Sequence, residues 1–423
     1  MPTVAYLANQ FPAAVESYVM DEIRELRRRG VKIISGSVRR PIASKEAGGK
    51  TAEICLEPVR LPTLLRAFLL IGKRWKSISP LIARVLLKGS EPPKVRLKAL
   101  LHTLLGACYV TRLQDCEVDH IHIHHGYFGS WIGMTAARLL GVAFSMTLHG
   151  SDLLLHRTYL DEKLRHCRFC ITISEYNRQY ILDRFPKIDP GKIIVSRLGV
   201  DVGGPTLEVR TSVFTKRRFS ILAAARLHPV KNHSFLIHAC VHLRKLGLDF
   251  ECKIAGDGPE RNRMAYLIRA YQLGDTVTLL GEIPAQNMNS LYCQANLFVL
   301  TSRSEGIPLV LMEAMANQVI VLAPSITGIP ELISHGETGY LYQPGNLNDF
   351  TNRVAEIHRM TEENSSAEKL RHVRLAARTK IFQDFNREKN LQRFTDLFLQ
   401  SISDQPWSSP HEDSVLQQIQ LSL

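Results

Sequence analysis

The chain has 423 residues, of which 45% are hydrophobic, and a formal net charge of +13. Because one hydrophobic core rarely grows beyond about 250–300 residues, this length predicts two domains. The eight scattered cysteines exclude a small disulfide-stapled protein, and the longest apolar runs fall short of the roughly 20 residues that a spanning helix needs.

The amino terminus leads directly into an apolar run at residues 3–8, without the charged and apolar regions of a signal peptide. We therefore expect a cytoplasmic protein with reduced thiols. Cys167 and Cys170 form one CxxC pair with no second pair near it, so packing is favoured over a zinc or redox role.

Short β-branched runs alternate with amphipathic helical patterns along the first half, at residues 3–8, 31–37, 120–124, 143–148, 169–173 and 193–196. The rhythm restarts in the second half, at 219–224, 250–255, 276–280, 297–300 and 319–322. Strands that alternate with helices predict parallel, doubly wound sheets. We expect an α/β protein with two Rossmann-like sheets in tandem, and ligands in the cleft between the domains beyond the strands' carboxyl ends.

Composition also suggests where the domains begin and end. The first Rossmann-like domain would cover residues 1–199, with a helical basic insertion at about 40–117. A turn-rich linker at 200–217 leads to the second domain at 218–385. A last helix at 386–402 would return to the first domain, and 403–423 would form a disordered tail.

Positive charge is concentrated in residues 60–112, which carry eleven Lys or Arg and one acid, Glu91, for a net charge of +10. Apolar residues recur between the cations at helical spacing, which predicts amphipathic basic helices. A solvated face on a core and a surface docked on anionic lipid are both compatible with this pattern. Nucleic acid is disfavoured, because few aromatics interleave with the cations.

The segment from Ser302 to Asn317 reads as a strand, a loop and a helix. Glu305 precedes Gly306 at the predicted helix start, where free N–H groups and the positive dipole end attract anions or hydroxyls. Glu313 follows eight residues later, about 12 Å along a helix and too far for a glycoside hydrolase pair. We expect the two carboxylates to bind separate sugar rings, rather than to serve as a helix cap and a solvated side chain.

Two cations, Arg226 and Lys231, follow the first strand of the second domain in a loop that opens a helix. Such side chains are usually solvated, but at this position they suit a diphosphate, which arginine binds through two donors and lysine through a point charge. In the first domain, His149 follows the fourth strand and points to the cleft, although a lone histidine is more often structural.

At these residues the chain resembles glycosyltransferase family 4, a family of retaining GT-B enzymes, over roughly residues 3–400. The resemblance rests on Arg226 with Lys231, Glu305 with Glu313, and the segments 149–152 (His-Gly-Ser-Asp), 255–259 (Ala-Gly-Asp-Gly-Pro) and 328–332 (Gly-Ile-Pro-Glu-Leu). Segments 9–17, 119–126 and 173–177 resemble the colanic-acid-type exopolysaccharide enzymes of this family.

The resemblance implies a GT-B fold and a division of roles. Arg226 and Lys231 would bind the donor diphosphate, and Glu313 the ribose hydroxyls. His149 and Glu305 would be catalytic by positioning the donor sugar and stabilising charge. The implied donor-binding residues are Arg226, Lys231, Gly256, Gly258, Gly281, Ile283, Gly306, Ile307, Pro308, Leu309 and Glu313. The implied acceptor-side residues are Glu16, Ser17, His125, Gly126 and Asp152.

We therefore expect a metal-independent, retaining glycosyltransferase without a cofactor, since the chain has no Asp-x-Asp motif. It would move a hexose or N-acetylhexosamine from a nucleotide-sugar, UDP-linked before GDP-linked, to a lipid-linked or polysaccharide acceptor at the inner membrane face. A nucleotide-sugar epimerase and a non-catalytic sugar- or membrane-binding relative are the alternatives. The sequence does not give the oligomeric state.

Overall fold

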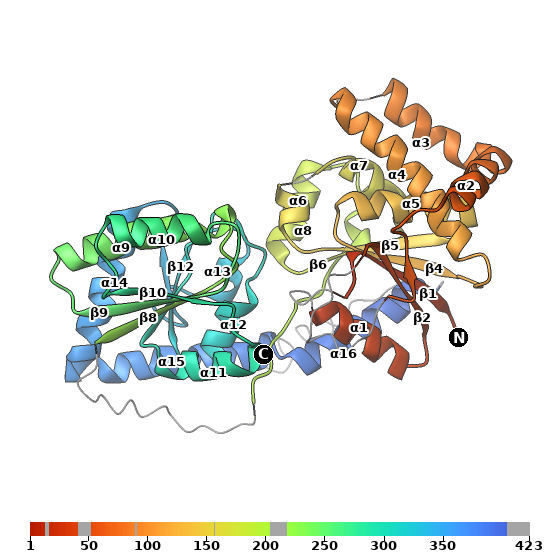
Figure 1. Cartoon of the computed structure of the whole chain (residues 1–423). Helices are drawn as coiled ribbons and strands as arrows, with labels where there is room; N and C mark the ends of the chain where they lie inside the picture. The colour runs from red at the N-terminus through yellow and green to blue at the C-terminus, as the bar shows by residue number, and fades with distance from the viewer. Residues whose placement is uncertain (13–16, 41–51, 89–90, 156, 204–217, 404–423) are drawn as a thin grey trace, which may run out of the picture. The chain divides into compact units, whose positions relative to one another are not determined.

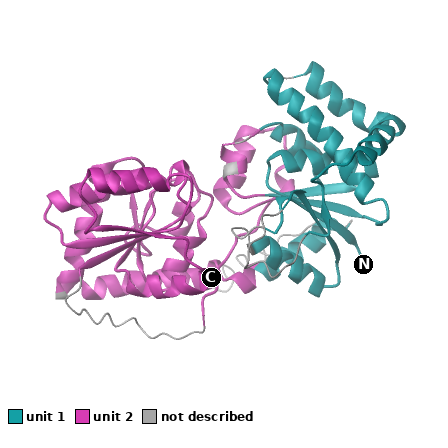
Figure 2. Cartoon of the chain, viewed as in Figure 1, with its two compact units in different colours: residues 1–147, 158–170, 391–423 teal, residues 148–157, 171–390 magenta. Residues whose placement is uncertain are grey.

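The computed structural model describes residues 1–12, 17–40, 52–88, 91–155, 157–203 and 218–403 (Figure 1). The chain divides into two compact units (Figure 2). Unit 1 comprises Met1–Thr147, Thr158–Cys170 and Leu391–Leu423, and unit 2 comprises Leu148–Arg157 and Ile171–Asn390. Most of the predicted linker and nearly all of the predicted tail lie outside the described residues, and the domain boundaries stay predictions.

The first sheet has seven strands in the order β3-β2-β1-β4-β5-β6-β7. The strands are β1 (Thr3–Gln10), β2 (Lys32–Arg39), β3 (Ile54–Cys55), β4 (His120–His124), β5 (Ala143–Leu148), β6 (Cys170–Thr172) and β7 (Ile193–Val195). The pairings among β1 to β5 are all parallel. Helices therefore supply the crossovers, as the alternating pattern predicts.

The helices of the first half follow the same alternation. They are α1 (Ser17–Arg28), α2 (Leu61–Lys73), α3 (Trp75–Leu87), α4 (Pro93–Arg112), α5 (Phe128–Leu140), α6 (Ser151–Leu154), α7 (Leu160–His166) and α8 (Glu175–Arg184). In unit 1, α5 packs on β1 and β4, α4 packs on α5, and α2 packs on α4. The predicted basic insertion is thus helical and forms a layer beyond α5 (Figure 1).

Residues of β4 alternate between the two faces of the sheet, as a strand's period of two requires. Ile123 faces α5, where a Cβ added to Gly133 would lie 2.5 Å from its Cδ1 atom. His122 and His124 face the other way, and the ring of His122 lies 5.0 Å from Phe398 of α16 (Arg387–Ile402). One face of β4 is therefore aliphatic and the other is lined by histidine.

The second sheet has six strands in the order β10-β9-β8-β11-β12-β13, again with parallel pairings. The strands are β8 (Phe219–Ala224), β9 (Phe250–Ala255), β10 (Val277–Gly281), β11 (Leu297–Val299), β12 (Ile320–Pro324) and β13 (Tyr340–Tyr342). Their helices are α9 (His233–Lys245), α10 (Arg261–Ala270), α11 (Ala285–Gln294), α12 (Leu309–Ala316), α13 (Ile329–Leu332), α14 (Leu347–Glu362) and α15 (Ala367–Asp384).

Each face of the second sheet carries its own core, because successive side chains of a strand point to opposite faces. Ile221 and Ala223 of β8 join the cluster that includes residues of α9 and α14. Leu222 and Ala224 join the cluster that includes residues of α12 and α15. The fold is therefore two parallel, Rossmann-like sheets, as predicted.

Some elements differ from the sequence-based expectation. Strands β3 and β13, of two and three residues, were not predicted. Helix α12 begins at Leu309, with Pro308 as its N-cap, so Glu305 lies in the preceding loop and not at the helix start. Among the described residues, no helix is long and apolar enough to cross a bilayer.

Candidate active site

The strand order of the second sheet reverses between β8 and β11, which are neighbours in the sheet but not in sequence. Ligands of doubly wound sheets bind where the order reverses, beyond the strands' carboxyl ends. The loop after β8 carries Lys231 and the loop after β11 carries Glu305, and the Lys231 Nζ lies 2.6 Å from the Glu305 Oε1. The two predicted donor-site residues therefore meet at the reversal point.

Hydrogen bonds of the two loops hold Lys231 in place. The Thr301 hydroxyl donates to the Lys231 carbonyl oxygen at 3.0 Å. The backbone N–H of Arg303 donates to the carbonyl oxygen of Val230 at 2.8 Å. The Lys231 side chain is 26% exposed and that of Glu305 only 9%, so the ion pair is largely shielded from water. These positioning contacts have no local sequence signal.

Arg226, the other predicted diphosphate ligand, lies two residues after β8 and is exposed. Its guanidinium makes no ion pair or hydrogen bond within the described part of the chain. A guanidinium with all its donors open is suited to bind an oxyanion through two hydrogen bonds.

Glu313 projects from α12 and accepts a 2.7 Å hydrogen bond from the Tyr292 hydroxyl. Burial raises the pKa of the Glu313 carboxyl above its ordinary value, while the hydrogen bond from Tyr292 opposes that rise. Burial also raises the pKa of Tyr292, and Glu313 adds to the effect. Tyr292 was missed by sequence reasoning, which did not predict its burial. A buried tyrosine needs a partner for its hydroxyl.

The predicted glycines Gly256, Gly258 and Gly281 bring backbone segments together after β8, β9 and β10. The N–H of Gly256 donates to the Gly281 carbonyl oxygen at 2.7 Å. A Cβ on Gly256 would lie 2.1 Å from the Ala225 carbonyl oxygen, and one on Gly258 would lie 2.5 Å from that of Leu227. Only glycine permits these approaches, and the contacts shape the loop that presents Arg226.

The remaining predicted donor-side residues are apolar and face the interior. Ile307 is 4% exposed and belongs to the core beneath α12. Pro308 is buried, while Ile283 and Leu309 are partly buried against the same core. Since Pro308 has no N–H, Gly306 and Ile307 are the backbone donors of this loop nearest the helix.

His149 follows β5 directly, in a tight turn that Asp152 organises. The buried Asp152 carboxylate accepts the backbone N–H groups of His149 at 3.1 Å and of Gly150 at 2.8 Å. Within unit 2, a Cβ on Gly306 would lie 2.2 Å from the His149 carbonyl oxygen, and one on Gly150 would lie 3.0 Å from the Gly306 nitrogen. His149 thus adjoins the Gly306 loop, and Asp152 shapes that junction.

The segment 328–332, which carries part of the family resemblance, also makes contacts that hold neighbouring loops and helices in place. A Cβ on Gly328 would lie 2.8 Å from the Gly306 carbonyl oxygen. Glu331 accepts the backbone N–H groups of Glu175 and Tyr176 at the start of α8, at 3.1 and 2.7 Å. This carboxylate therefore satisfies helix N–H groups that would otherwise lack intrahelical partners.

The predicted acceptor side is described only in part. Glu16 lies outside the described residues, and Ser17 begins α1. His125 has a φ of 71° and is 8% exposed, directly after β4. The carbonyl oxygen of Gly126 accepts a 2.8 Å hydrogen bond from the Nζ of Lys163, a buried lysine that was not predicted.

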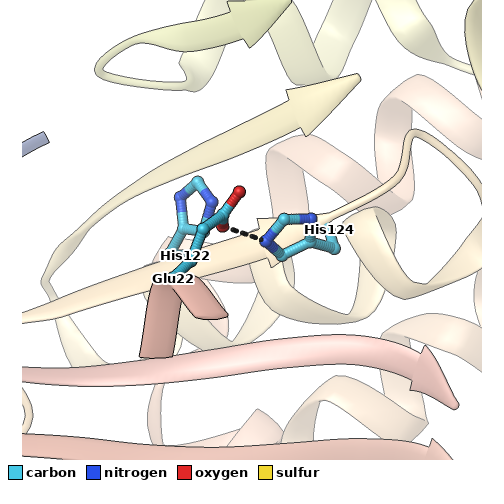
Figure 3. Close-up of side chains that lie close together, drawn as sticks. All are labelled: Glu22, His122 and His124. Carbon is cyan, nitrogen blue, oxygen red and sulfur yellow. Dashed lines mark hydrogen bonds and ion pairs between the residues drawn. The ribbon is translucent and has the colours of Figure 1, made fainter. Parts of the chain in front are cut away.

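A buried cluster of Glu22, His122 and His124 lies in unit 1 (Figure 3). Two imidazoles and a carboxylate are a donor set that zinc accepts. The cluster is nevertheless hydrogen bonded: Glu22 Oε2 lies 2.9 Å from His124 Nε2 and accepts from the Tyr6 hydroxyl. Both ring nitrogens of His122 lie beside hydroxyls, at 2.8 and 3.1 Å. We interpret the cluster as a hydrogen-bonded network in the core.

Comparison with known structures places this fold in a class. The Anabaena protein HepE, crystallised with UDP and with UDP-glucose, superposes with a TM-score of 0.68 at 17% identity, over 94% of this chain and 100% of HepE. The two Rossmann-like domains define the fold as that of the GT-B glycosyltransferases.

Family models match both halves of the sequence. The model described as Glycosyltransferase Family 4 matches residues 15–203, and the model described as Glycosyl transferases group 1 matches residues 208–372. The amylovoran biosynthesis glycosyltransferase AmsK of Erwinia amylovora is 33% identical over 67% of this chain and 70% of its own length. The chain belongs to the family 4, group 1 glycosyltransferases.

A second relative is similar over a shorter stretch. The colanic acid biosynthesis glycosyltransferase WcaL of Salmonella typhimurium is 34% identical over 50% of this chain. The chain spans about half the length of this relative, 52%.

Proposed function

We propose that this protein transfers a hexose or N-acetylhexosamine from a nucleotide-sugar to a lipid-linked or polysaccharide acceptor during exopolysaccharide synthesis. The observation that carries the proposal is the shielded Lys231–Glu305 pair at the reversal point of the second sheet. In the donor complex, Lys231 and Arg226 bind the diphosphate, and Glu305 accepts hydroxyls of the donor sugar. The names of AmsK and WcaL support the exopolysaccharide assignment.

Two further features support a donor bound at this point. Within the described residues, the buried hydroxyls of Ser302 and Thr327 have no hydrogen-bond partner, and a buried unpartnered hydroxyl is costly. Both residues lie in loops that adjoin Gly306. Glu313, held by Tyr292, is proposed to bind the ribose hydroxyls. UDP is preferred to GDP as the leaving group, since the structural neighbour HepE was crystallised with UDP-glucose.

The proposed reaction retains anomeric configuration and needs no metal or cofactor. The attacking acceptor oxygen forms the new bond to the anomeric carbon on the face from which the diphosphate leaves, and its proton passes to the leaving phosphate. Lys231, Arg226 and the N–H groups near Gly306 stabilise the charge on the departing diphosphate. His149 positions the donor sugar next to the same loop. We propose that this takes place in the cytoplasm, at the inner face of the plasma membrane.

A donor panel tests the proposal. We expect calorimetry to detect binding of a UDP-hexose or UDP-N-acetylhexosamine. The Lys231→Ala variant should bind this donor about 10–100-fold more weakly, because a charge-assisted contact is lost. Unchanged affinity in this variant would refute the diphosphate assignment. A modified free sugar formed without acceptor would indicate an epimerase, and absence of any turnover with intact binding would indicate a non-catalytic relative.

Metal removal gives a second test of the reaction. Full activity is expected after exhaustive EDTA treatment, because cationic side chains supply the charge that a divalent ion would otherwise provide. Loss of activity that manganese restores would contradict metal independence. The anomeric configuration of the product, read by NMR, tests retention.

A further inference from the structure

The helical layer of α2, α3 and the first half of α4 displays large apolar side chains to solvent. Of the sixteen exposed large hydrophobic residues in the described chain, nine lie between residues 61 and 101, about a tenth of the sequence. They are Leu61, Leu65, Phe68, Leu69, Trp75, Leu86, Leu87, Leu97 and Leu101. We call these residues the apolar face. A concentration of exposed apolar residues is typical of interaction sites.

The apolar face includes a complete helical stripe. Leu61, Leu65, Phe68 and Leu69 recur at the spacing that places side chains on one side of a helix. They are between 58% and 74% exposed, while Ala67, on the opposite side of α2, is fully buried. The stripe is therefore not the side by which α2 packs on α4.

Exposed cations lie on, or at the ends of, the same helices as the apolar face. Eight lysines and arginines of this layer are exposed, and none of the eight forms an ion pair with a described acid. They are Arg60, Arg66, Lys73, Arg74, Lys76, Lys88, Lys94 and Lys98. The single acid of residues 60–112, Glu91, is already paired with Arg84 at 2.9 Å. The layer is thus apolar and cationic, with no exposed acid.

We propose that the apolar face inserts into an anionic lipid bilayer, with the eight cations at the level of the headgroups. Basic residues beside exposed leucine, phenylalanine and tryptophan are the composition of helices that lie in a membrane interface. A second copy of the chain is a poorer occupant, because a two-fold dimer would place the same cations against one another. Nucleic acid phosphates would leave the leucines uncovered.

Vesicle flotation of the full-length chain tests this docking. Wild-type protein is expected to bind phosphatidylcholine vesicles only when they contain phosphatidylglycerol. The triple variant Lys73→Gln, Arg74→Gln, Lys76→Gln should bind about 100-fold more weakly, since each cation near an anionic surface contributes about five-fold. The matched control Lys187→Gln, Lys245→Gln, Lys369→Gln removes three exposed cations of unit 2 and should bind as wild type.

Apolar insertion is tested separately from charge. The variant Leu65→Ser, Phe68→Ser, Leu69→Ser should lose the fraction of binding that survives high salt, whereas the control Leu246→Ser, Tyr266→Ser, at exposed positions elsewhere, should keep it. Trp75, which is 53% exposed, should shift its emission to the blue on vesicles and be quenched by brominated lipid. Trp75→Phe should abolish that shift.

Several results would overturn the proposal: no binding to anionic vesicles, wild-type binding by the apolar variant, or loss of a dimer in that variant, which would make the face a self-interface. The location of the reaction rests on the proposed function, but lipid binding does not. Calorimetric affinity for the nucleotide-sugar should be unchanged in every variant of the layer. Failure of docking and failure of donor binding are therefore distinguishable.

Discussion

Lys231 and Glu305 neutralise one another at a largely buried place, so each has a structural role besides the proposed one. Removal of one partner leaves an uncompensated charge, whereas removal of both can be nearly neutral. A ligand-binding role predicts a different pattern, because donor affinity should not return when both charges are removed. The two roles can therefore be separated by a mutant cycle.

We expect Lys231→Met and Glu305→Gln each to lower the melting temperature, and the double variant to recover most of the loss. Donor affinity should stay at least about ten-fold below wild type in the double variant, because the charge-assisted contacts are still missing. Calorimetry and thermal denaturation measure both quantities on the same samples. Wild-type donor affinity in the stable double variant would make the pair purely structural.

The charge of Glu313 is expected to destabilise the fold, in contrast to the charges of the ion pair. Burial disfavours the ionised carboxyl and raises its pKa. Glu313→Gln keeps an acceptor for the Tyr292 hydroxyl and removes the desolvated charge. We expect this variant to melt at a higher temperature and to bind donor about 10–100-fold more weakly. The exposed control Glu337→Gln should change neither quantity. A lower melting temperature for Glu313→Gln would show that its charge stabilises the fold.

Among the elements, those with a long periodic pattern were predicted best. Strands β4, β5, β8 and β9 have the predicted bounds, since each spans at least five residues and includes two that are β-branched or aromatic. Strand β13 was not predicted, because three residues are too few to show an alternating hydrophobic pattern. The start of α12 was misplaced because Gly306, Ile307 and Pro308 continue its apolar run. These residues lie in an irregular loop, from which Ile307 and Pro308 bury their side chains.

The junction between the turn after β5 and the loop before α12 leads to a prediction for this pair of elements. Gly306→Ala places a methyl group 2.2 Å from the His149 carbonyl oxygen, so the two loops must separate. We expect a stability loss of about 1–3 kcal/mol and at least a ten-fold loss of transfer activity. Gly274→Ala meets no atom within 4 Å and is the control. Wild-type activity of Gly306→Ala would exclude a role for this close approach.

Across the whole molecule, buried histidines couple stability to pH. Burial lowers the pKa of His120 to about 3 and of His233 to about 4, and it also lowers that of His102 to about 4. In the unfolded chain these groups titrate near 6.5, so below that pH the unfolded state binds more protons. The contribution of these neutral histidines to the free energy of unfolding is complete above pH 6.5 and is lost as the pH falls toward 4.

We therefore expect the urea concentration at the unfolding midpoint to decrease as the pH is lowered from 7 to 5. His120 and His233 should each remove up to about 1.4 kcal/mol of unfolding free energy per pH unit. His233→Gln should make the dependence shallower, whereas His372→Gln, whose side chain is 76% exposed, should leave it unchanged. A pH-independent midpoint would contradict the burial of these neutral imidazoles.

Sequence reasoning found residues of the site but few of their contacts. Lys231 and Glu305 were both predicted as ligands of the donor, yet their ion pair joins residues 74 positions apart and has no local pattern. The same holds for Tyr292 and Glu313, 21 positions apart. Residue type and position after a strand are visible in sequence, whereas side-chain pairing depends on the packing of separate elements.

The backbone contacts among the loops after β8, β9 and β10 limit which sequence changes these loops can accept during evolution. Since main-chain atoms of Ala225, Gly256 and Gly281 set the spacing, side-chain replacements elsewhere in these loops alter polarity while leaving the shape intact. An inserted residue would displace all three loops together. New donor preferences should therefore arise by point substitution at positions such as Ile283, and rarely by changes in loop length.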